Sequence, residues 1–281
     1  MTLSDFTPWH DDLICVDSDG CAVDTMDVKH KRCFGPCMVA EWHLQQWEKP
    51  ILERWNEINL YTMTRGINRF KGLAMALCEI DKQYTPIEGV DILRKWTEEA
   101  AELSNPALEA EIGRTDAPIL KKALAWSKAV NRAIGELPWE VKKAFPGVRE
   151  AFAAARGFAD IAVVSSANRD AVEEEWERFG LLPLVDLPLC QDVGSKAYCI
   201  AELKKKGYAP DHILMVGDAP GDEDAADTNG VLYFPILVNH EAESWQLFLR
   251  DALPRFRGGD YAGAYQQERR AAFRTNLGLS I

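Results

Sequence analysis

Short apolar runs alternate with helical patterns in the two outer parts of the chain. Continuous apolar segments, typical of strands buried on both faces, occur at residues 13–16, 161–164, 213–216 and 231–237. A further strand is predicted at residues 184–189, which are apolar except for Asp186. Segments with helical spacing separate most of them, and strands that alternate with helices form a parallel sheet with helices on both faces. The pattern predicts an α/β fold with a Rossmann-like parallel sheet as its core.

The middle of the chain has a different texture. Residues 25–144 show helical spacing without a convincing strand, and their prolines divide them into several helices. A connection of roughly 120 residues is far longer than an ordinary crossover, so it forms a subdomain of its own. We expect an α/β core from 1–24 and 145–240, an inserted helical domain at 25–144, and a C-terminal helical extension at 241–281 packed on the core.

Charge and composition narrow the possible partners. The 281 residues include 32 Lys+Arg and 44 Asp+Glu, a formal net charge of −12 that argues against nucleic-acid binding. No apolar stretch approaches the length of a membrane span, and the N-terminus has neither the basic start nor the apolar core of a secretory signal. These features predict a cytoplasmic protein without membrane contact. The oligomeric state does not follow from the sequence.

The seven cysteines form no regular framework. Their odd number indicates reduced thiols. Cys33 and Cys37 are four residues apart, but no second pair of ligands completes a zinc site.

Three polar clusters follow predicted strands. They are Asp17-Ser18-Asp19-Gly20, Ser165-Ser166, and Gly217-Asp218 with Asp222. Ligands of open parallel sheets bind beyond the carboxyl ends of the strands, so we expect these clusters to converge there.

Converging carboxylates require a cation, and a set of oxygen ligands suits Mg²⁺. Asp17 and Asp218 are the natural direct ligands, and Asp19 offers a backbone carbonyl. Asp222 or Glu223 could orient the waters of the metal. The sequence therefore predicts Mg²⁺ as the cofactor.

The same groups suit phosphoryl transfer. Asp17 can act as a nucleophile that forms an aspartyl-phosphate. Asp19 can protonate the leaving alcohol and then deprotonate the attacking water. Lys196, which begins a predicted helix, can balance the charge of the phosphate and the nucleophile.

Phosphoryl oxygens also need hydrogen-bond donors. The predicted donors are Ser165 and the backbone N–H groups around Ser18, Gly20 and Ser166. Gly20 also lets the backbone turn tightly after the strand.

These segments resemble a known family. LICVDSDGCAVDT, FPGVREAF, IAVVSSAN, GSK and ILMVGDAPGDEDAA occur in the order typical of the haloacid dehalogenase (HAD) superfamily, in its phosphatase-like branch. The resemblance implies that Asp17 is the nucleophile, Asp19 the general acid/base, Ser165 the phosphate-binding hydroxyl, Lys196 the charge-balancing lysine, and Asp218 with Asp222 the acidic metal motif. It also implies that residues 25–144 are a helical type 1 cap. Cys21 departs from the threonine usual after the motif's glycine.

One segment of the insertion is a candidate for contact with the non-reacting part of a substrate. Residues 64–71 place three cations around a predicted helix start, which is suited to an anion. We favour Arg65 and Asn68 for this role. The alternative is a solvated helix face.

Two of these roles have a simpler alternative, since Ser165 could cap the following helix and Lys196 could be a surface lysine. Asp222 could be the N-cap of its helix as well as a metal-site acid, because the two roles are compatible.

The sequence predicts a Mg²⁺-dependent phosphohydrolase that cleaves a small phosphorylated metabolite through an aspartyl-phosphate. The open alternatives are a phosphomutase of the β-phosphoglucomutase type, a phosphonate hydrolase using Lys29 or Lys31 to form an imine, and a non-catalytic phosphate-binding regulatory module. A dehalogenase is disfavoured, because halide displacement needs neither Asp19 nor an acidic metal site.

Overall fold

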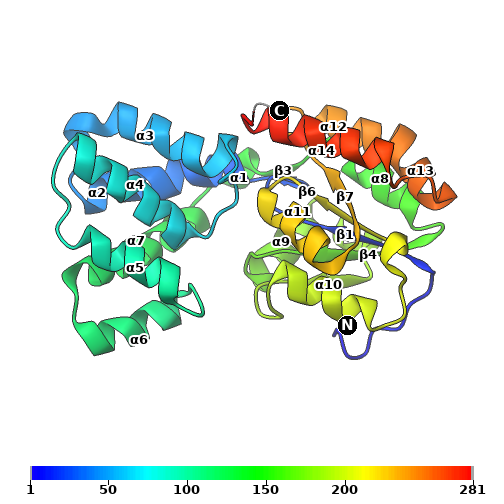
Figure 1. Ribbon diagram of the computed structural model, residues 1–281, viewed down its shortest axis with the longest axis horizontal. Coiled ribbons are helices and arrows are strands. Elements are labelled where there is room, and N and C mark those ends of the chain that lie inside the picture. The colour runs from blue at the N-terminus through cyan, green and yellow to red at the C-terminus, as the bar shows by residue number, and fades with distance from the viewer. Residues whose placement is uncertain (1, 280–281) are drawn as a thin grey trace. The chain divides into compact units, whose positions relative to one another are not determined.

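The computed structural model describes residues 2–279, which divide into two compact units. The α/β unit comprises the chain up to Met26 and from Lys142 onward, and the helical unit comprises Asp27–Val141. Met1 and the last two residues of the predicted 241–281 extension lie outside the described residues. Figure 1 shows the helices and strands of each unit.

A five-stranded sheet forms the centre of the α/β unit. Its strands lie in the order β5-β4-β1-β6-β7, and every neighbouring pair is parallel. Ile14 of the central strand lies between Ile161 and Leu214, and nearly every strand residue is buried. The predicted Rossmann-like parallel sheet is confirmed. The strands are β1 (Asp12–Val16), β4 (Ala159–Val164), β5 (Leu187–Leu189), β6 (Ile213–Gly217) and β7 (Leu232–Pro235).

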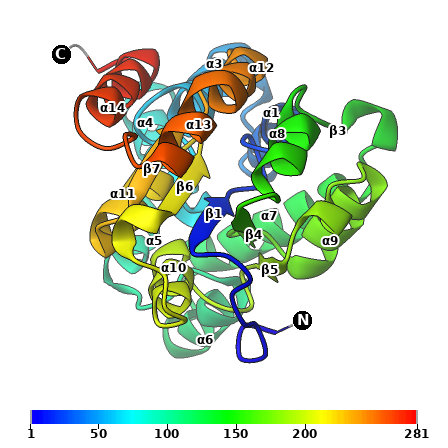
Figure 2. The same cartoon turned by 90° about the vertical axis from the view of Figure 1, so that its right-hand side faces the viewer.

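Helices cover both faces of this sheet (Figure 2). One face carries α8 (Val148–Ala155), α9 (Arg169–Arg178), α12 (Glu241–Leu247) and α13 (Leu253–Gly258), the last two joined by a π-helical turn. The other face carries α10 (Lys196–Lys204) and α11 (Pro220–Asn229). The last helix, α14 (Ala264–Asn276), packs against the edge strand β7. Burial of apolar side chains between these layers holds the parallel strands together, so that their carboxyl ends lie at one edge of the sheet.

A short antiparallel ribbon lies where the chain leaves and re-enters the α/β unit. Its strands are β2 (Val23–Asp24) and β3 (Lys143–Ala144), with Val23 opposite Ala144. The sequence analysis predicts no strand here, because two residues are too few for a period of two to be recognised.

The helical unit has its own aromatic core. Trp55 and Trp126 are fully buried and pack with Phe34 and Phe70. The α-helices of this region are α1 (Met26–Lys29), α2 (Gly35–Glu41), α3 (Glu48–Asn56), α4 (Arg69–Gln83), α5 (Val90–Glu99), α6 (Asn105–Thr115) and α7 (Pro118–Gly135).

Among the described residues, no helix of the chain combines the length and apolar character needed to span a membrane.

Several predicted boundaries differ from the structure by one to three residues, among them the strand predicted at 231–237, which is β7. Two of the differences follow from a proline. The predicted strand 184–189 shortens to β5, because Pro183 lies in a 3₁₀ turn over Leu182–Leu184. The helix predicted to begin at Asp222 begins at Pro220, whose fixed φ suits the first helical position.

Candidate active site

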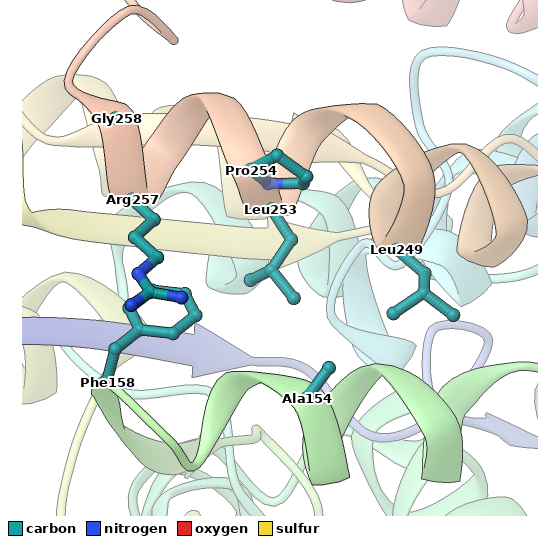
Figure 3. A pocket seen from close by; sticks show the side chains of 7 residues that line it. All are labelled: Ala154, Phe158, Leu249, Leu253, Pro254, Arg257 and Gly258. Carbon is teal, nitrogen blue, oxygen red and sulfur yellow. The ribbon is translucent and has the colours of Figure 1, made fainter.

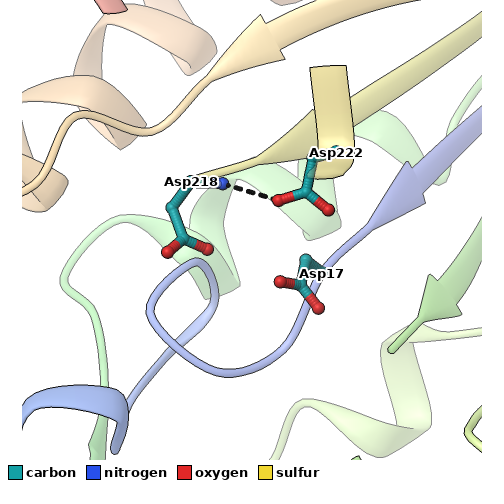
Figure 4. A group of neighbouring side chains, drawn as sticks. All are labelled: Asp17, Asp218 and Asp222. Carbon is teal, nitrogen blue, oxygen red and sulfur yellow. Dashed lines mark hydrogen bonds between the residues drawn. The ribbon is translucent and has the colours of Figure 1, made fainter. Parts of the chain in front are cut away.

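Three buried carboxylates meet at the carboxyl edge of the sheet (Figure 4). Asp17 follows β1, Asp218 follows β6, and Asp222 lies in the first turn of α11. One oxygen from each carboxylate lies within 4.8 Å of the others. The Asp17 N–H donates to the Val216 carbonyl at 3.0 Å, so the pairing of β1 with β6 brings the first two together. Residues about 200 positions apart thus converge as the strand ends predict.

Lys196 joins this cluster from the first residue of α10. The Ser195 hydroxyl caps that helix by accepting from the Tyr198 N–H. This cap sets where the helix begins and therefore where Lys196 lies. The Lys196 Nζ lies 2.7 Å from Asp17 Oδ2 and 2.5 Å from Asp222 Oδ1. Its interpretation as a surface lysine is therefore wrong.

The charges of the cluster do not cancel. Burial raises the pKa of Asp17 to about 8, with Asp222 and Asp218 adding to the effect and Lys196 opposing it. Burial alone would lower the pKa of Lys196, but Asp17 and Asp222 outweigh it and raise that pKa above its ordinary value. Three carboxylates facing one ammonium leave an excess of negative charge, so the donor set fits a hard divalent cation such as Mg²⁺.

Asp222 is committed to contacts within the protein. Its Oδ2 accepts from the N–H groups of Asp218 and Ala219, at 3.1 and 3.0 Å, while Oδ1 contacts Lys196. Ala219 is the N-cap of α11, so the interpretation of Asp222 as the N-cap is wrong. These contacts suit a side chain that orients the other two carboxylates, and Asp17 and Asp218 are the residues that could hold a metal directly.

The loop after β1 carries Asp19, two residues after Asp17. Asp19 is partly exposed, and the Thr25 hydroxyl donates to its Oδ1. Gly20 has φ of +83°, a left-handed conformation that glycine adopts without strain. The Ser18 N–H donates to Asp17 Oδ1 and the Gly20 N–H to the Val23 carbonyl, so both predicted phosphate donors are used inside the loop in this structure.

The Ser18 side chain points into the core. It is fully buried, and its Oγ accepts from the indole N–H of Trp176 on α9 at 2.8 Å. Trp176 also stacks on Phe152, with ring centroids 5.7 Å apart. The sequence analysis missed Trp176, because its helical spacing indicates only a core residue.

We expect Trp176→Phe to destabilise the protein by about 1–3 kcal/mol, because the buried Ser18 hydroxyl loses its donor while the aromatic packing is kept. Chemical denaturation measures the change, and turnover should fall with it because the Asp17–Asp19 loop loosens. Trp9→Phe is the matched control, since Trp9 is 77% exposed. Equal stability of both variants would contradict this role.

The serines after β4 differ in exposure. Ser165 is buried, and its Oγ accepts from the Ala167 N–H at 3.1 Å, whereas Ser166 is exposed. The N-cap of α9 is Asn168, so the alternative that Ser165 caps this helix is wrong. Phosphate binding by Ser165 and Ser166 stays a prediction.

Cys21 is fully buried in the same loop. Its Sγ donates to the Val216 carbonyl at 3.6 Å, and burial, followed by the neighbouring carboxylates, raises the pKa of its thiol. The thiol therefore stays protonated and takes no nucleophilic role. The seven cysteines all lie among the described residues, and they form no disulfide there.

The substrate candidates of the helical unit are held within it. Arg65 is buried and donates to the Leu60 carbonyl at 2.8 Å. Asn68 caps α4 by accepting from the Phe70 N–H, and its amide donates to the Leu103 carbonyl. Arg69 instead donates to the neutral Ser127 and Asn131 side chains over the Phe34 ring. Substrate contact by Arg65 and Asn68 stays a prediction.

Lys31 does not suit imine formation. Burial alone would lower the pKa of Lys31, but its hydrogen bond to Asp27 at 2.7 Å outweighs this and raises that pKa. An imine requires the neutral amine, so Lys31 lends no support to a phosphonate hydrolase.

A separate apolar hollow of about 480 Å³ lies between α8 and α13 (Figure 3). At the rim of the hollow the Arg257 guanidinium lies over the Phe158 ring, with its Cζ 5.2 Å from the ring centroid. Phe158 directly precedes β4, at the opposite edge of the sheet from the carboxylates. The other lining residues are Ala154, Leu249, Leu253, Pro254 and Gly258, and none is a predicted site residue.

The fold and the site define an α/β protein with a cluster of buried carboxylates at the ends of parallel strands. A family model described as haloacid dehalogenase-like hydrolase matches residues 88–235, which include Ser165, Lys196, Asp218 and Asp222. The chain belongs to this family of hydrolases, which confirms the resemblance seen in the sequence.

Solved structures with a similar fold have low identity to this chain. A haloacid dehalogenase-like family protein from Streptococcus pneumoniae is 12% identical, covering 84% of this chain and 90% of its own, with a TM-score of 0.44. A putative phosphoglycolate phosphatase from Lactobacillus delbrueckii is 14% identical, covering 80% and 86%, with 0.48. A putative β-phosphoglucomutase from Thermotoga maritima is 14% identical, covering 80% and 84%, with 0.44. No curated protein matches the chain.

Proposed function

We propose that this protein is a Mg²⁺-dependent phosphohydrolase that cleaves a small phosphorylated metabolite through an aspartyl-phosphate. The observation that carries the proposal is the meeting of Asp17, Asp218 and Asp222 with Lys196 at the carboxyl edge of the sheet. Membership of a hydrolase family supports the same class of reaction.

Two steps follow from the residues present. In the first, an Asp17 carboxylate oxygen bonds to phosphorus, the bond from phosphorus to the ester oxygen breaks, and Asp19 gives its proton to the departing alkoxide. In the second, Asp19 takes a proton from water, whose oxygen bonds to phosphorus as the bond to Asp17 breaks. Inorganic phosphate leaves, and both side chains return to their starting forms.

The remaining groups balance charge. Lys196 holds its ammonium against Asp17. In the proposed reaction Lys196 meets one phosphoryl oxygen and the Ser165 hydroxyl donates to another. Bound Mg²⁺, held by Asp17, Asp218 and the Asp19 carbonyl, would supply positive charge against the phosphate oxygens.

A phosphate-release screen over sugar phosphates, phosphoglycolate and nucleotides tests the proposal. We expect turnover of at least one of these esters in Mg²⁺, complete loss of turnover in excess EDTA, and recovery when Mg²⁺ is restored. Recovery of an isomeric phosphosugar in place of inorganic phosphate would indicate a phosphomutase. Binding without turnover across the panel would favour the non-catalytic module.

A further inference from the structure

The peptide group that joins Gly217 to Asp218 is held from both sides. Its N–H donates to Asp222 Oδ2 at 3.1 Å. Its carbonyl accepts from the Ile236 N–H at 2.8 Å and from the Tyr233 hydroxyl at 3.1 Å. This peptide precedes one metal-site carboxylate and orients another, so its orientation sets the geometry of both.

Only glycine fits at position 217, because no space is left there for a side chain. A Cβ added to Gly217 would come within 2.4 Å of the Asp222 carboxylate. Hydrogen bonds to a peptide carbonyl also polarise its N–H and strengthen the bond that the N–H donates. The Tyr233 hydroxyl therefore acts on Asp222 through one shared peptide. Burial raises the pKa of the Tyr233 phenol, so the hydroxyl keeps the proton it donates.

Tyr233 is itself held by the end of the chain. It lies on the edge strand β7, where its outward N–H and carbonyl have no neighbouring strand to bond. Gln266 Oε1 accepts from the N–H, and the Tyr261 hydroxyl donates to the carbonyl, both at 2.8 Å. The Tyr233 ring packs edge-on against Phe273 and lies under the Arg270 guanidinium.

The same C-terminal segment also grips α11, the helix that carries Asp222. Arg270 donates to Glu223 at 3.0 Å and to Asp227 at 2.7 Å, and Arg274 donates to Glu223 at 3.1 Å. Glu223 is buried beside Asp222 in the sequence. We call Tyr261, Gln266, Arg270 and Arg274 the C-terminal brace.

We propose that Tyr233 is a positioning residue for the metal site, and that the C-terminal brace holds it in place. Tyr233 acts through the 217–218 peptide on Asp218 and Asp222, and the brace fixes the strand and the helix that carry these groups. This inference rests on the proposed function in one respect, namely that the carboxylates bind a divalent cation.

Tyr233→Phe tests the inference, since it removes the hydroxyl and keeps the ring. We expect Mg²⁺ affinity, measured by titration calorimetry on metal-free protein, to fall about 10-fold, as for other partners that orient a ligand from outside. The Mg²⁺ concentration for half-maximal turnover should rise by the same factor, while kcat at saturating Mg²⁺ stays within about 3-fold of wild type.

Tyr208→Phe is the matched control. It also removes one buried hydroxyl, which donates to Asp160 at the amino end of β4, the opposite edge of the sheet. We expect a comparable loss of stability and unchanged Mg²⁺ affinity. Unchanged affinity in Tyr233→Phe, or equal weakening in both variants, would overturn the positioning role.

Within the brace, Gln266→Leu removes the acceptor of the Tyr233 N–H, and exposed Gln267 on the same helix supplies the control Gln267→Leu. Only the first should weaken Mg²⁺ binding. Hydrogen–deuterium exchange of residues 217–222 in metal-free protein separates this inference from the proposed function. Faster exchange in Tyr233→Phe supports the inference that Tyr233 positions residues 217–222, even if wild type binds no Mg²⁺. Failure of wild type to bind Mg²⁺ would overturn the proposed function alone.

Discussion

Replacing Asp17 with Asn is expected to lower phosphate release by roughly 10⁴-fold or more, because the amide cannot attack phosphorus. The substitution keeps the size of the side chain at the end of β1. Wild type quenched during turnover should carry the mass of one phosphoryl group, and the variant should carry none. Turnover like that of wild type in Asp17→Asn would remove Asp17 as the nucleophile.

The loss should not arise from unfolding. The pKa of Asp17 lies above the ordinary carboxyl value, so its contribution to folding stability is present at low pH and is lost as pH rises toward about 8. An amide does not titrate, so the metal-free variant should be at least as stable as wild type at pH 8. Asp12→Asn is the control, because Asp12 lies at the amino end of the same strand, where it pairs with His212.

The convergence of the site could be predicted because parallel strands obey a simple rule. Their carboxyl ends share one edge, so Asp17 after β1 and Asp218 after β6 must be neighbours if the two strands pair. The apolar runs identify the strands without any knowledge of distant contacts. Lys196 follows less directly, since only its place at a helix start before the last acidic motif marks it.

The supporting side chains could not be predicted, because nothing local marks them. Trp176 and Tyr233 lie in apolar patterns that indicate core, and their polar atoms bond to residues 158 and 16 positions away. For the same reason, the sequence of the extension after residue 240 predicts helices and no function. Its contacts with β7 and α11 depend on the folded edge of the sheet, where outward backbone groups need partners.

The commitment of Asp222 to backbone N–H groups shows why residue type alone misplaces a role. An aspartate near a helix start suggests an N-cap, but Ala219 occupies that position and Asp222 reaches back to it from the third helical residue. The start of α11 at Pro220 decides whether Ala219 or Asp222 is the N-cap.

Removing the charge of Lys196 is expected to have the largest effect on stability. Its side chain is 14% exposed and lies against Asp17 and Asp222, whose side chains are 9% and 0% exposed. Lys196→Met leaves buried carboxylates without a cation, which costs about 3–5 kcal/mol in metal-free protein at neutral pH. The kcat should fall about 100-fold or more through the lost charge against the phosphate.

The responses to pH and to Mg²⁺ distinguish this electrostatic loss from a packing defect. Without Lys196 the pKa of Asp17 rises further, so its carboxyl is protonated at pH 5, and the deficit of the variant should shrink there and widen toward pH 8. Mg²⁺ should raise the melting temperature of the variant more than that of wild type, because the cation replaces the missing charge. Lys205→Met, at the exposed C-cap of the same helix, removes only a contact to Glu202 and should change neither the pH response nor the Mg²⁺ response. A deficit that is constant from pH 5 to pH 8 and indifferent to Mg²⁺ would mean that Lys196 supports packing, and the charge balance argued for the site would then be wrong.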